Sequence, residues 1–240
     1  MYLPGDLLEA RPFKEASSTT IVHNQDRLAA FLKIAYEYSL VAPFENRKNG
    51  APELSGTLEV KANIVRAWLR INKNSISVLV CHKCSMFCLP SELCELPSLH
   101  EIALSENLIT KLPSEIEHLS TLHTLLISFN PLTQLPDEIG NLSTLTELYI
   151  LRNKLTELPN TFGRLSALTD LLLSDNKLSK LPDGFGNLKA LTELNLSFNK
   201  ITRLPDDIEK LSALTKLNLA YNKLKQLPEG IRHHESVEEN

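Results

Sequence analysis

The residues with the clearest chemical potential are four cysteines that lie close together in the chain. Cys81 and Cys84 form a C-x-x-C pair, and Cys88 and Cys94 follow it. Thiols at this spacing are typical of a zinc site or of a redox-active pair, although zinc ribbons usually carry a second C-x-x-C pair and this sequence has none. Three interpretations follow: buried structural cysteines, a metal site or a redox pair.

Other residues that could perform chemistry are scattered along the sequence. None of the seven histidines accompanies a serine or cysteine in a pattern typical of an activated nucleophile. The eight glycines form no phosphate-binding loop. We therefore predict a protein that is not an enzyme, with no catalytic residue, no metal and no cofactor.

The elements that must position all these residues follow a strict period of 23 residues. Six asparagines, which we call the asparagine ladder, mark this period. They are Asn107, Asn130, Asn153, Asn176, Asn199 and Asn222. Seven Leu-Pro pairs step in parallel, ending at Pro90, Pro113, Pro136, Pro159, Pro182, Pro205 and Pro228. A fixed period of this length is the signature of a solenoid, in which each turn buries its apolar side chains only by stacking on its neighbours.

Each repeat unit predicts a short strand followed by a short return. The L-x-L segment places two side chains inward and its neighbours outward, because side chains alternate along a strand. The asparagine ends the strand, where its amide can replace lost backbone hydrogen bonds. The stretch after Leu-Pro is long enough for one turn of 3₁₀ or α-helix. We therefore predict an α/β solenoid, a horseshoe of about seven turns with a parallel sheet on its concave side.

The period also assigns places to the cysteines. Counting back by 23 residues puts Cys81 at an inward leucine position and Cys84 at the asparagine position of a degenerate first turn. This register favours buried structural cysteines that point into different parts of the turn. The segment from Met1 to Lys14 lacks the pattern of a secretory signal, so we expect reduced thiols and folding in a cytosol. The metal and redox interpretations remain as alternatives.

Three regions are expected along the chain. Residues 1–75 form an N-terminal segment and a helical cap, whose buried face contains Val65, Trp68 and Leu69; residues 76–230 are the repeats, and residues 231–240 are a polar, acidic tail. Only residues 229–240 are available to cover the last strand, around Leu217 and Leu219. That shortage predicts a partly exposed C-terminal edge, self-association through it, or a truncated chain.

Composition narrows the classes of partner and the location. The formal net charge is −4, and 25 basic residues are spread along the chain, so nucleic acid is not an expected partner. No apolar run is long enough to span a bilayer. We expect a protein that is cytoplasmic, or secreted without a signal peptide into a host cytosol.

The repeat unit resembles the intracellular leucine-rich-repeat family, in the class with a 23-residue L-P-x-x-I-G-x-L unit. The segments 139–142 (I-G-N-L) and 185–188 (F-G-N-L) carry that consensus, and the resemblance covers residues 76–230. The segment 67–76 before the repeats is similar to the N-terminal caps of bacterial leucine-rich-repeat effectors, here without the ubiquitin-ligase domain of some of them. The resemblance implies a non-catalytic protein-binding module, expected to be a secreted bacterial effector acting in a host cell. The alternative is an endogenous cytosolic scaffold or signalling adaptor of the Ras-group leucine-rich-repeat type.

The outward strand positions predict where a partner binds. Leu126, Tyr149 and Leu172 share one outward column and predict an exposed apolar strip, because an outward leucine has no core to join. Beside the strip lie Leu151, Phe129 and Arg152. A neighbouring column contains Glu147, Asp170 and Glu193, which favour a basic partner protein. For the aromatic residues that precede the ladder asparagine, packing against their neighbours is the alternative to binding; these are Phe129, Phe198 and Tyr221.

Overall fold

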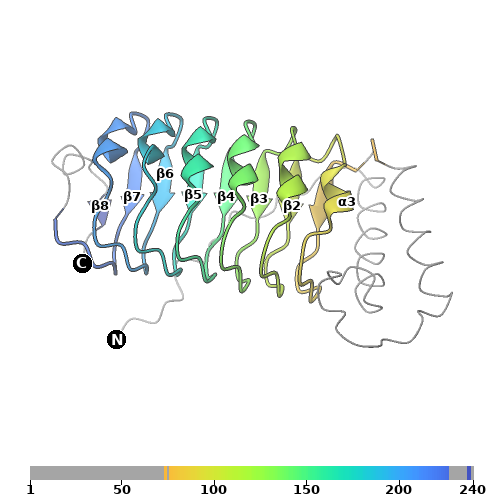
Figure 1. Ribbon diagram of the computed structural model, residues 1–240, viewed down its shortest axis with the longest axis horizontal. Helices are drawn as coiled ribbons and strands as arrows, with labels where there is room; N and C mark the ends of the chain where they lie inside the picture. The colour runs from red at the N-terminus through yellow and green to blue at the C-terminus, as the bar shows by residue number, and fades with distance from the viewer. Residues whose placement is uncertain (1–72, 75, 227–236, 239–240) are drawn as a thin grey trace.

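The computed structural model describes residues 73–74, 76–226 and 237–238, and shows a stack of similar turns (Figure 1). Each turn contributes one short strand to a single open sheet of parallel strands in the order β1 to β8. The strands are β1 Val78–Val80, β2 Glu101–Ala103, β3 Thr124–Leu126, β4 Glu147–Tyr149, β5 Asp170–Leu172, β6 Glu193–Asn195, β7 Lys216–Asn218 and β8 Val237–Glu238. The predicted solenoid with a parallel sheet is confirmed, whereas the expected N-terminal cap with Val65, Trp68 and Leu69 lies outside the described residues.

In the described turns between β1 and β7, a short helical return runs back along the face opposite the sheet. In most turns the proline of a Leu-Pro pair is the extended residue just before the return, where its missing N–H costs no hydrogen bond. The first return is an α-helical turn and the others are 3₁₀ segments: α3 Ser91–Cys94, η2 Ser114–His118, η3 Asp137–Asn141, η4 Asn160–Arg164, η5 Phe185–Asn187 and η6 Asp206–Lys210. The predicted short returns are therefore confirmed.

The hydrophobic core is a continuous column between the sheet and the returns. Leucines and isoleucines from every described turn are almost fully buried in it. Two successive turns contribute Phe162 and Phe185, whose rings stack in parallel with centroids 6.1 Å apart. Gly163 lies against the next turn so closely that a Cβ there would overlap the carbonyl of Gly184. The returns thus pack at a spacing that their small residues permit.

The C-terminal edge differs from the expectation of an open strand. Leu217 pairs with Val237 and Asn218 with Glu238, so β8 continues the sheet beyond β7. Leu217 and Leu219 are buried. The separation between Leu217 and Val237 is 20 residues, against 23 between Leu194 and Leu217, so a shortened last turn brings part of the tail alongside β7. The expectation of a partly exposed edge at β7 is therefore wrong for Leu217 and Asn218, whereas self-association through the C-terminal edge stays a prediction.

The first cysteine pair is also different from the prediction. Cys81 and Cys84 are joined by a disulfide, with Cα atoms 5.7 Å apart, within the range that a disulfide spans. The expectation of reduced thiols that point apart was wrong, because the chain turns sharply between the two cysteines, where Lys83 has a positive φ of 55°. The other two cysteines, Cys88 and Cys94, lie outside the disulfide.

Candidate partner-binding face

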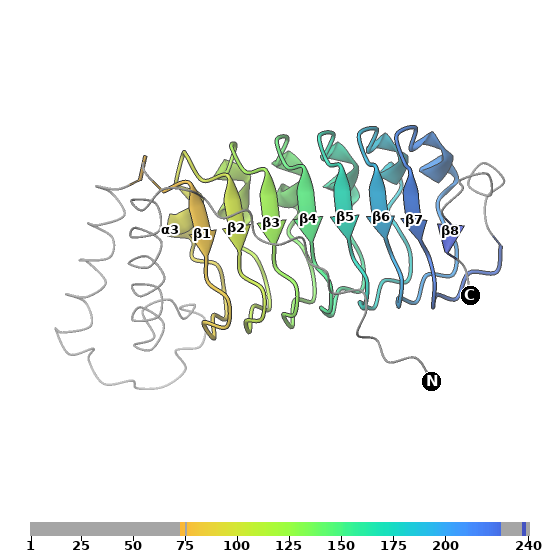
Figure 2. The same ribbon diagram turned by 180° about the vertical axis from the view of Figure 1, so that it is seen from behind.

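The register of the sheet places the outward side chains in straight columns. Leu126 pairs with Tyr149 and Tyr149 with Leu172, while Glu147 pairs with Asp170 and Asp170 with Glu193. Neighbouring members of a column are therefore one strand spacing apart, about 4.8 Å. In the described part of the chain, no helix packs on this outward face, which we call the strand face (Figure 2).

The predicted apolar strip lies on the strand face but is less exposed than expected. Leu126, Tyr149 and Leu172 are half-buried, and Ala103 in the same column is fully buried. The reason is the close strand spacing, since each side chain covers the flank of the next one in its column. Leu151 and Phe129, beside the strip, are half-buried as well.

A further column has an unusual backbone conformation that sequence reasoning missed. In every described turn the residue before the ladder position has φ between 50° and 58°, the left-handed region that non-glycine residues rarely adopt. The members of this left-handed column are Lys83, Glu106, Phe129, Arg152, Asp175, Phe198 and Tyr221. Since no glycine marks these positions, the residue types carry no signal of the conformation. The column turns the chain inward, away from the sheet, and presents its side chains at the edge of the strand face.

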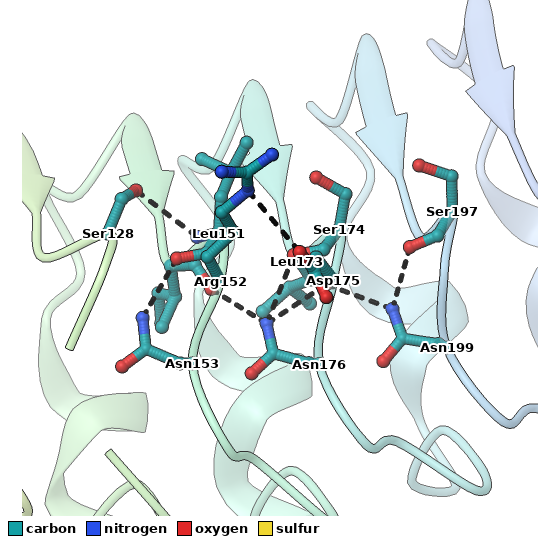
Figure 3. A network of polar contacts seen from close by, with 11 residues as sticks. Ser128, Leu151, Arg152, Asn153, Leu173, Ser174, Asp175, Asn176, Ser197 and Asn199 are labelled. Atoms are coloured by element: carbon teal, nitrogen blue, oxygen red, sulfur yellow. Dashed lines mark hydrogen bonds and ion pairs between the residues drawn. The ribbon is translucent and has the colours of Figure 1, made fainter. Parts of the chain in front are cut away.

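The asparagine ladder holds these turns in place from below (Figure 3). The amide nitrogen of Asn176 donates to the carbonyls of Ile150, at 2.8 Å, and Leu173, at 3.1 Å. Its amide oxygen accepts the N–H of Leu155 at 3.0 Å. One buried side chain thus satisfies backbone groups of its own turn and of the preceding one, as predicted from its donor and acceptor chemistry.

Side chains of the left-handed column contact one another along the stack. The guanidinium of Arg152 lies 5.1 Å from the centre of the Phe129 ring, and Arg152 Nε is 3.3 Å from Asp175 Oδ2 (Figure 3). The Phe198 and Tyr221 rings stack with centroids 4.3 Å apart. Phe129, Phe198 and Tyr221 therefore pack against neighbouring side chains of the column, which was the alternative to partner binding. Phe198 and Tyr221 nevertheless keep 46% and 60% of their surface exposed, more than the residues of the apolar strip.

The acidic column concentrates negative charge beside the apolar strip. Glu147 and Asp170 lie on adjacent strands, and in the described part of the chain neither is paired with a cation. Asp170 accepts a hydrogen bond from Thr169 Oγ1 at 2.7 Å. Glu193 is the end member that is paired, with Lys216 Nζ at 3.1 Å. Like charges directly opposite each other on neighbouring strands repel, so a cation placed over Glu147 and Asp170 would relieve that repulsion.

The search for other chemistry covers the described residues alone. Among them, no group of three or more histidine, cysteine or acidic side chains could hold a metal ion. Within the same residues, no helix is long and apolar enough to cross a membrane. The remaining cysteine chemistry is limited, because burial raises the pKa of Cys88 and raises that of Cys94 to about 12.

Comparison with protein families gives two matches within the repeats. Residues 129–200 match the family described as a leucine-rich repeat region, and residues 189–233 match the family described as leucine-rich repeats in two copies. No curated protein sequence matches the chain. These matches and the fold agree that the repeats are leucine-rich repeats.

Solved structures of the same fold come from bacteria and plants. A leucine-rich-repeat protein of Leptospira interrogans has a TM-score of 0.65 and 33% identity, over 70% of this chain and 43% of its own. InlP of Listeria monocytogenes has a TM-score of 0.59 and 29% identity, over 68% of this chain and 46% of its own. The ectodomain of the receptor kinase GASSHO1/SCHENGEN3 from Arabidopsis thaliana was solved in complex with Casparian strip integrity factor 2. It has a TM-score of 0.56 and 28% identity, over 68% of this chain and 23% of its own. The chain therefore spans less than half the length of each of these proteins.

Proposed function

Because the repeats fold as a leucine-rich-repeat solenoid, we propose that the chain is a non-catalytic interaction module that binds a partner protein on its strand face. The observation that carries this proposal is the alignment of Leu126, Tyr149 and Leu172 on three adjacent strands, directly beside the column of Glu147, Asp170 and Glu193. Solenoids commonly use their extended sheet surfaces for binding.

The chemistry of the two columns suggests a partner with apolar and basic groups. Half-buried leucine and tyrosine side chains already have restricted rotamers. Apolar contacts over them therefore cost little side-chain conformational entropy on binding. The carboxylates of Glu147 and Asp170 would accept lysine or arginine side chains of the partner and speed its approach. Leu151, Phe129 and Arg152 form the border of the contact, where the Arg152–Asp175 pair keeps the guanidinium in place.

We propose further that the chain is a secreted bacterial interaction protein. Two of the similar structures are bacterial, from Leptospira and Listeria. The Cys81–Cys84 disulfide supports a passage through an oxidising environment over residence in a reducing cytosol. An effector acting in or on a host cell is the function we favour, and no observation favours the alternative of an endogenous Ras-group-type scaffold.

The test is affinity capture from host and bacterial lysates with the whole chain as bait. Leu126→Ala and Tyr149→Ala, singly and together, should reduce recovery of the captured partner. Leu108→Ala is the matched control, because Leu108 is exposed but belongs to the loop beyond the ladder asparagine rather than to the strands. Recovery that is unchanged by the strand-face variants, or equally reduced by Leu108→Ala, would contradict binding on this face.

The charge component is tested separately on the captured partner. Glu147→Gln with Asp170→Asn should slow association several-fold at low salt and have a smaller effect at high salt, since steering by exposed charges is screened. An association rate that does not change with these two substitutions would exclude a basic partner surface at this site.

A further inference from the structure

The loops that follow the strands carry positive charge along one edge of the last four repeats. The residue after each ladder asparagine there is an exposed lysine, giving a row of Lys154, Lys177, Lys200 and Lys223. Three more exposed cations lie two or three residues further along these loops, at Lys180, Arg203 and Lys225. We call these seven side chains the basic edge. The corresponding loop positions contain a single carboxylate, that of Glu157.

The backbone holds the lysine row in register. The N–H of Lys177 donates to the carbonyl of Leu155 at 2.8 Å, and the N–H of Lys200 donates to Leu178 at 2.8 Å. Equivalent bonds join Lys154 to Leu132 and Lys223 to Ile201. Successive lysines are therefore about one strand spacing, roughly 4.8 Å, apart along the stack. In the described part of the chain, none of the seven cations forms an ion pair.

The basic edge is a local feature in an acidic protein. The whole chain has a net charge of −4, and the equivalent loop positions in the first three described turns carry one cation, Lys111. Seven of the 25 basic residues are thus gathered by the fold onto the loops of the last four repeats. Charge of one sign concentrated on one surface attracts a partner of the opposite sign.

We propose that the basic edge binds the surface of an anionic lipid bilayer, as a function separate from partner binding on the strand face. Clusters of four to eight lysine or arginine residues are typical of contacts with anionic headgroups. The exposed loop residues beside the cations include Thr156, Ser179 and Thr202, and no aromatic residue lies in these loops. A single-stranded nucleic acid would favour aromatic side chains for stacking. Lysines at regular spacing along one edge of the stack suit a flat surface that can meet all of them together.

The test measures sedimentation of the full chain with vesicles. Phosphatidylcholine vesicles that contain about a third phosphatidylserine should bind the protein at low salt, and pure phosphatidylcholine vesicles should not. Each lysine near such a surface contributes about fivefold to the partition coefficient, so Lys177→Gln alone should lower it about fivefold. The variant with Lys154→Gln, Lys177→Gln, Lys200→Gln and Lys223→Gln should lower it by more than a hundredfold.

The control variant removes the same charge from other surfaces, with Lys83→Gln, Lys189→Gln, Lys210→Gln and Lys216→Gln, and circular dichroism checks that both variants fold. The proposal is supported if the control loses much less binding than the row variant. It is overturned if anionic vesicles do not bind the wild type, if both variants lose binding equally, or if duplex DNA or heparin removes the protein from vesicles when present at equal charge concentration. An outcome that overturns the lipid proposal does not affect the strand-face proposal, because the variants that test binding on the strand face lie at other residues.

Discussion

The Cys81–Cys84 disulfide joins the ladder position of the first described turn to the residue three places before it. In later turns a side-chain hydrogen bond of the ladder asparagine joins the same two positions. In the next turn, the amide nitrogen of Asn107 donates to the carbonyl of Leu104 at 2.9 Å, again from the ladder position to the residue three places before it. The first described turn replaces that hydrogen bond by a disulfide. The Asn107 amide oxygen also accepts the backbone N–H of Cys84 at 2.9 Å, so the disulfide turn is tied to the ladder above it.

Replacing the disulfide by the repeat's own residues should make the protein insensitive to reductant. In Cys81→Leu/Cys84→Asn, the asparagine can bridge the turn as Asn107 does, and the leucine fills the buried position of Cys81. We expect a dithiol reductant to lower the melting temperature of the wild type and to leave that of the double variant unchanged. The measurement is thermal unfolding with and without reductant. Cys81→Ser/Cys84→Ser is the comparison, expected to be less stable because it has neither link; equal melting temperatures for the two double variants would contradict this account.

Ladder asparagines should differ in importance with their burial. Asn176→Ala leaves the Leu155 N–H and two carbonyls without their buried partner, which should cost about 3 kcal/mol of unfolding free energy. Asn222 makes similar bonds but is half-buried, so water can replace its amide and Asn222→Ala should cost about 1 kcal/mol. Urea titration measures both. Equal losses of unfolding free energy in the two variants would show that burial does not determine how much a ladder asparagine stabilises the protein.

The left-handed conformation of Ser85 can be tested without disturbing a side-chain contact of the column. Ser85 has φ 56° and is exposed. Ser85→Val should destabilise the protein by about 1–2 kcal/mol, because a β-branched residue is strongly disfavoured in this region. Ser85→Gly should retain or slightly raise stability, since glycine adopts positive φ without steric cost. A valine variant as stable as the glycine variant would show that the turn relaxes.

Thiol reactivity should follow the environments of Cys88 and Cys94, the two cysteines outside the disulfide. Burial, with smaller contributions from Glu115, Glu95 and Glu92, raises the pKa of Cys94 to about 12. Burial also raises the pKa of the half-buried Cys88, where nearby Lys111 opposes the rise. Iodoacetamide at pH 8 should therefore modify Cys88 before Cys94, as read by peptide mass spectrometry. Because the folded pKa of Cys94 exceeds the unfolded value, its contribution to stability is present below pH 9 and declines as the pH rises above it. Modification of Cys94 at the rate of Cys88 would contradict its burial.

The columns of the strand face could be predicted because the period never changes. With 23 residues in every turn from Leu79 to Leu217, the partners of Tyr149 on neighbouring strands follow from counting, and the register agrees. The ladder bonds of Asn176 follow equally from its donor and acceptor groups. The lysine row could also have been found by the same counting, one position after the ladder.

The exposure of the strand-face side chains, the pairing of the last strand and the disulfide could not be predicted by counting along the sequence. The half-burial of Leu126 and Leu172 depends on how closely neighbouring strands cover each other, and the pairing of Val237 with Leu217 depends on a turn that breaks the period. The Cys81–Cys84 disulfide depends on positive φ at Lys83, at a position where no glycine announces it. Each of these features arises from geometry between residues rather than from residue type.

The sequence by itself determined the solenoid, the order of its strands and the residues that share each column, because a strict period translates directly into a stack of equivalent positions. The tertiary structure alone decided how far each side chain is covered, which cysteines are bonded and how the last strand is paired. The physical reason is that periodicity fixes which positions are equivalent, whereas burial and bonding depend on the distances between turns once they are packed.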